Sequence, residues 1–136
     1  MKPLTQEWVE KAEGDFQVAA QIMRRRKQRV YDAACFHAQQ TVEKYFKARL
    51  CEAGVVFPKT HDLAALLKLL LPLEPLWSAF LQQAHLLEDY AVDFRYPGDT
   101  ATLAEARLAL KNCKTIRREV RSRGAGQKSN LRSAWR

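Results

Sequence analysis

The sequence contains few of the residues that interrupt regular structure. Its 136 residues include only five glycines and five prolines, which argues against a turn-dense all-β fold. There are three cysteines, scattered and without a C-x-x-C pair, at Cys35, Cys51 and Cys113. An odd, unclustered set excludes a disulfide scaffold and a zinc ribbon, and it is typical of reduced thiols.

Long apolar runs are absent as well. The longest uncharged one, residues 69–73, is interrupted by Pro72 and is far too short to cross a bilayer. Two acidic residues, Glu7 and Glu10, occur close to the N-terminus, so a signal peptide is not expected. These observations predict a cytoplasmic protein that does not associate with membranes.

Familiar catalytic signatures are missing too: there is no Gly-rich phosphate loop, no H-E-x-x-H and no G-x-S-x-G. A di-iron bundle needs Glu-x-x-His pairs on facing helices. The nearest approach is His85 with Glu88 and Asp89, present once and in reversed order. We therefore expect neither a metal nor another cofactor.

The positive charge is concentrated at the C-terminus. Residues 117–136 carry seven Lys and Arg against Glu119 alone, so they account for most of the net charge of +8. We predict a helical domain over residues 1–124 and a disordered basic tail over 125–136. The tail is either a solvated end or an RNA-binding segment, in which Trp135 could stack on a base.

Helical spacing of apolar residues runs through nearly the whole chain. It predicts helices over about residues 6–27, 32–52, 61–70, 75–90 and 103–123. The expected N-caps are Thr5, Asp32, Thr60 and the capping box of Thr102 with Glu105, and the expected helix ends include Gly54 and Gly124. No segment alternates with a period of two. The predicted fold is all-α, a four- to five-helix antiparallel up-and-down bundle.

A polar ridge in the second helix is the first candidate site. It is spaced by three, four and three residues and comprises His37, Gln40, Lys44 and Lys47. Glu43 can pair with Lys47 at i,i+4. The ridge is either a solvated face with a salt bridge or a binding surface for an anion such as a nucleotide phosphate.

Residues 32–48, DAACFHAQQTVEKYFKA, resemble the HEPN domain family, whose members often read CFHAQQAAEKxLKAxL in this helix. Further landmarks follow in the family's order over roughly residues 5–120: Trp8, Asp15, the KTHDL of residues 59–63, Tyr90 and the RYP of residues 95–97. The resemblance implies a dimeric bundle that associates with nucleotides or RNA. It also implies a partner, a minimal nucleotidyltransferase, as in two-component toxin–antitoxin pairs.

Ribonucleases of this family carry an Arg-x(4–6)-His motif. The histidine exchanges a proton with the 2′-hydroxyl or the leaving oxygen, and the arginine stabilises charge on phosphorus. Arg95 matches the arginine, but no histidine follows within seven residues. His61 is a possible substitute, although it could instead help Thr60 to cap a helix. Arg95 could equally form a salt bridge with Asp93 or Asp89, and His37 could be a hydrogen-bonded core residue.

The sequence therefore predicts a non-catalytic binding subunit more readily than an enzyme. In this hypothesis Lys44, Lys47 and Arg95 hold phosphate, while Gln40 and His37 orient it. His61 and Asp62 border the site, and Tyr96 lies beside Arg95 unless it only fixes the turn. The alternative is a metal-independent endoribonuclease that uses Arg95 with His61 or His37. A third hypothesis is a structural partner subunit with no ligand.

Overall fold

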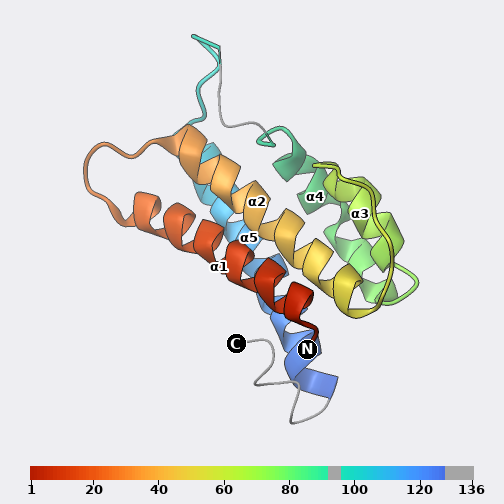
Figure 1. Cartoon of the computed structure of the whole chain (residues 1–136). Helices are drawn as coiled ribbons and strands as arrows, with labels where there is room; N and C mark the ends of the chain where they lie inside the picture. Colours follow the sequence, from red (N-terminus) through yellow and green to blue (C-terminus); the bar gives the residue numbers. More distant parts are fainter. Residues whose placement is uncertain (92–95, 128–136) are drawn as a thin grey trace.

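The centre of the structure is α2 (Tyr31–Glu52), around which the other helices pack (Figure 1). The computed structural model describes residues 1–91 and 96–127, and over these ranges it contains helices and no strand. The other elements are α1 (Pro3–Arg24), α3 (Leu63–Leu70), the 3-10 helix η1 (Pro75–Phe80), α4 (Leu81–Glu88) and α5 (Leu103–Gln127). The predicted all-α bundle is confirmed.

Contacts between distant residues define the directions of the helices. Lys2 at the start of α1 donates to Glu52 at the end of α2, so these two helices are antiparallel. The α2 and α5 helices run in the same direction, because Asp32 accepts from the Ala101 amide near the start of both. The α3 helix runs in this direction too, since Gln39 donates to the His61 carbonyl before α3 and Arg49 donates to Glu74 beyond its end. The α2 and α5 helices lie side by side (Figure 1).

Residues from every face of α2 are buried. The apolar residues at helical spacing along it are fully or almost fully buried: Ala34, Ala38, Val42, Tyr45, Phe46 and Leu50. Polar residues of the same helix are buried too, among them Gln39, Thr41, Glu43 and Lys47. A helix with neighbours on several sides has no wholly solvated face, so these polar groups must find partners inside the protein.

Three of the predicted N-caps are wrong. The α1 helix begins at Pro3, two residues before Thr5, because proline suits the first helical turn. Asp32 lies inside α2, where its carboxylate accepts from Ala101 at 2.7 Å. The cap of α3 is Asp62, which accepts from the Ala65 amide at 3.1 Å, and Thr60 instead accepts from the Asp62 amide.

Other boundaries follow the prediction more closely. The capping box is present, with Thr102 and Glu105 each accepting from the other's amide at 3.1 Å. Gly54 follows α2 with a φ of +75°, a conformation that glycine adopts without strain. Gly124 does not end α5, which continues to Gln127. The rest of the predicted tail lies outside the described residues.

None of the helices in the described ranges combines the length and the apolar character that a bilayer crossing requires. The described residues also contain no group of three or more His, Cys, Asp or Glu side chains that could hold a metal ion. His85 contacts Glu88, with 3.4 Å between Nδ1 and the carboxylate.

Candidate functional site

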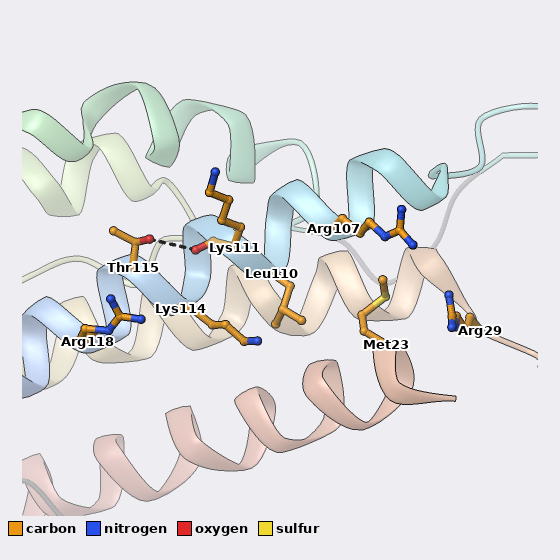
Figure 2. A pocket seen from close by; sticks show the side chains of 8 residues that line it. All are labelled: Met23, Arg29, Arg107, Leu110, Lys111, Lys114, Thr115 and Arg118. Carbon is orange, nitrogen blue, oxygen red and sulfur yellow. Dashed lines mark hydrogen bonds between the residues drawn. The ribbon is translucent and has the colours of Figure 1, made fainter. Parts of the chain in front are cut away.

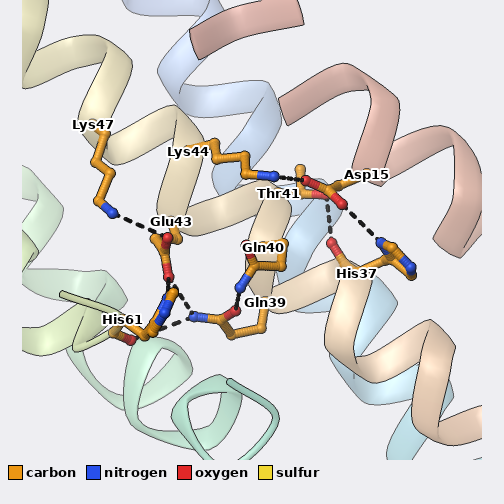
Figure 3. Close-up of polar contacts among 9 residues, drawn as sticks. All are labelled: Asp15, His37, Gln39, Gln40, Thr41, Glu43, Lys44, Lys47 and His61. Atoms are coloured by element: carbon orange, nitrogen blue, oxygen red, sulfur yellow. Dashed lines mark hydrogen bonds and ion pairs between the residues drawn. The ribbon is translucent and has the colours of Figure 1, made fainter. Parts of the chain in front are cut away.

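The predicted ridge on α2 is divided into two polar clusters, each built around one carboxylate (Figure 3). Glu43 is the centre of the first cluster, which faces the segment before α3. Asp15 of α1 is the centre of the second. Each carboxylate holds one histidine and one lysine.

In the Glu43 cluster, the carboxylate accepts from three donors. His61 Nδ1 lies 2.7 Å from Oε1, Gln39 Nε2 lies 3.2 Å from the same oxygen, and Lys47 Nζ lies 3.1 Å from Oε2. The side chain of Glu43 is only 3% exposed, whereas that of His61 is 65% exposed. A buried acidic group thus anchors an imidazole that faces solvent.

This contact determines what the His61 ring can do. Since Glu43 accepts at Nδ1, the neutral ring carries its proton there, and Nε2 has a free lone pair. In the protonated ring, Nε2 becomes a donor suited to a phosphate oxygen. Among the described residues, Nε2 of His61 has no hydrogen-bond partner.

The Asp15 cluster repeats this arrangement between α1 and α2. His37 Nδ1 lies 2.7 Å from Oδ1, and Lys44 Nζ lies 2.5 Å from Oδ2. The side chains of His37 and Lys44 are both partly exposed. The histidine is therefore oriented by a carboxylate here too, with a lysine beside it.

Lys47 and Gln40 lie deeper than the ridge interpretation suggests. The Lys47 side chain is 8% exposed, and its ammonium lies 5.4 Å from the centre of the Trp8 ring as well as next to Glu43. The predicted i,i+4 pair of Glu43 with Lys47 is thus present. The Gln40 amide donates to Gln39 at 2.8 Å and is buried. Both residues support the Glu43 cluster from within.

Two further predicted residues, Asp62 and Tyr96, lie outside the helices. Asp62 is adjacent to His61, and the hydrogen bond that its carboxylate accepts from the Ala65 amide lowers the pKa of that carboxyl. Tyr96 is largely exposed. Arg95 lies outside the described residues, as does Asp93, so both roles considered for Arg95 stay predictions.

Comparison with known families agrees with this architecture. The HEPN domain family model matches residues 5–123. The chain belongs to the HEPN domain family. No curated protein and no solved structure matches it significantly. Membership supports a nucleotide- or RNA-related function in general. The matched range contains all the residues of both carboxylate clusters.

Sequence reasoning about this HEPN domain overlooked the carboxylates at the cluster centres. From the sequence, Glu43 is paired only with Lys47, and Asp15 is only a family landmark in the first helix. The available signal was weak: Glu43 lies 18 residues from His61, and Asp15 lies 22 residues from His37. Only the packing of α1 and of the loop before α3 against α2 brings these groups together.

Proposed function

We propose that this HEPN domain binds the phosphate of a nucleotide or of RNA at the α2 site, defined as His37, Lys44, His61 and Asp62 with Arg95 and Tyr96. The observation that supports this most directly is the pair of carboxylate-held imidazoles, each with Nδ1 fixed and Nε2 left for a ligand. Charge-assisted donors of this kind are strong partners for phosphate oxygens. Lys47 and Gln40 act through Glu43, since both are buried.

The proposal includes two protein partners, a second copy of the chain and a minimal nucleotidyltransferase, as in toxin–antitoxin pairs. Both follow from the family resemblance. Co-expression of this chain with a nucleotidyltransferase encoded beside its gene is expected to yield a stable complex on size-exclusion chromatography with light scattering. The chain alone is expected to elute as a dimer. Complex formation without any nucleotide or RNA binding would favour the structural-subunit hypothesis.

Ligand binding at the α2 site is expected to depend on His61 and Arg95. We expect ATP, GTP or a short RNA to bind the wild type, and His61→Ala or Arg95→Ala to weaken binding by about tenfold, the effect of losing one charge-assisted contact. Isothermal titration calorimetry measures this. His85→Ala is the matched control, because His85 is also an exposed histidine whose Nδ1 contacts a glutamate. Equal binding by wild type and Arg95→Ala would remove Arg95 from the site.

A metal-independent endoribonuclease is the second candidate, and the Glu43–His61 pair favours it. In enzymes that use a histidine for acid–base catalysis, a carboxylate can fix the tautomer and the orientation of the ring. We expect RNA cleavage in EDTA at some pH between roughly 5 and 9, lowered about 10²–10⁴-fold by His61→Ala and unchanged by His85→Ala. A complete absence of cleavage across that range would leave only the binding function.

A further inference from the structure

A second surface of the molecule has the chemistry of a polyanion site. A groove of about 510 Å³ lies between the end of α1 and one face of α5. Its lining is made of Met23, Arg29, Arg107, Leu110, Lys111, Lys114, Thr115 and Arg118 (Figure 2). Five of these eight residues are basic and none is acidic. None of them belongs to the α2 site.

Four of the cations form a regular row. Arg107, Lys111, Lys114 and Arg118 are separated by four, three and four residues, the spacing that puts side chains on one face of a helix. The row extends along about 16 Å of α5. Arg29 reaches the groove from the segment between α1 and α2 (Figure 2). An elongated row of charges suits a ligand with repeated negative charges better than a single phosphate.

The cations of the groove differ from the cations that pack between the helices. Lys44, Lys47 and Arg117 each have a carboxylate partner. The four cations of the α5 row are exposed, and within the described residues none forms a salt bridge. Their charge is therefore uncompensated by the protein. Burying these groups against phosphates removes no existing ion pair and releases counterions from the nucleic acid.

We infer that this groove binds the phosphodiester backbone of a single-stranded nucleic acid. Family membership makes RNA the natural source of such a strand. The apolar lining residues, Met23 and Leu110, are half-buried, so the groove lacks the protruding apolar side chains that insert into a lipid surface. Because the contacts are to phosphates, recognition is independent of sequence.

The test measures the binding of a labelled U12 RNA by fluorescence anisotropy from 50 mM to 500 mM salt. Lys111→Ala with Lys114→Ala is expected to weaken binding about tenfold at low salt. It is also expected to reduce the slope of log K against log salt by about 1.4, at about 0.7 for each single-strand contact. The matched control is Lys11→Ala with Lys68→Ala, two exposed lysines outside the groove whose loss changes the net charge equally. All four positions are exposed, so both variants are expected to melt like the wild type.

The outcomes separate this inference from the α2 site. The inference is supported when the groove variant loses U12 binding while ATP binding and its dependence on His61 are unchanged. Equal U12 binding by the groove and control variants would overturn it. Binding of anionic vesicles or polyglutamate at the groove, without binding of U12, would overturn it as well. Comparable salt slopes for U12 and dT12 support recognition through phosphates, and binding of U12 alone contradicts it.

Discussion

Truncation of Glu43 to alanine is expected to lower the free energy of unfolding by about 3–5 kcal/mol, the usual cost of removing one partner of a buried ion pair. The carboxylate is 3% exposed and accepts from Lys47, Gln39 and His61. Without it, the Lys47 ammonium stays buried with no opposite charge, and the Gln39 amide loses one acceptor. Urea unfolding followed by circular dichroism measures the loss.

The control for Glu43→Ala removes both charges. The double variant Glu43→Leu with Lys47→Met fills the same space with apolar groups and is expected to be more stable than Glu43→Ala alone, because no unpaired charge remains. Lys47 also packs against the Trp8 ring, a contact that methionine can replace. A cost below about 1 kcal/mol for Glu43→Ala would show that water reaches Lys47 and that the pair is not buried in solution.

The helices were predictable because their signals are local. Apolar spacing located all the long helices, and the Thr102–Glu105 box placed the start of α5 correctly. The wrong caps arose where another local feature prevailed. Pro3 started α1 before Thr5, and Asp62 stood closer than Thr60 to the first turn of α3. Gly124 has helix on both sides, which costs only about 1 kcal/mol relative to alanine.

The site was predictable only in part, because it depends on contacts between distant segments. The family motif identified His37, Lys44 and His61, but the ridge interpretation treated α2 as a surface helix. Once α1, α3 and α5 pack around it, Lys47 and Gln40 become internal. The row from Arg107 to Arg118 is a spacing that the sequence contains, yet only the packing of α1 beside α5 shows that no acidic residue of the described ranges lines the groove.

A second large effect is expected at Glu13, which connects three helices. Its carboxylate accepts two hydrogen bonds from Arg117, at 2.7 and 2.6 Å, and one from the hydroxyl of Tyr45. The guanidinium of Arg121 donates to that hydroxyl at 2.9 Å. Arg117 also stacks on Phe16, 4.1 Å from the ring centre. Glu13→Gln is expected to lower the free energy of unfolding by about 2 kcal/mol at pH 7, the size of a charge-assisted pair that is partly buried.

The loss at Glu13 is expected to depend on pH. Burial on its own raises the pKa of Glu13, but the hydrogen bonds from Arg117 and Tyr45 and the charges of Arg117 and Arg121 bring it below its ordinary value. A lowered pKa in the folded state means that the ionised carboxylate adds stability above the unfolded-state pKa of about 4.3. This stability is lost as the pH falls through the folded-state pKa.

The stability difference between wild type and Glu13→Gln should therefore be constant near neutral pH and shrink below about pH 4. Urea unfolding at pH 7, 5, 4 and 3 measures it. Glu10→Gln is the control on the same helix, since Glu10 is exposed and its side chain hydrogen-bonds only to Gln6 among the described residues. Its cost is expected to stay within about 0.5 kcal/mol at every pH. A Glu13→Gln deficit that grows as the pH falls would contradict the assignment, because the carboxylate would then be stabilised in its protonated form.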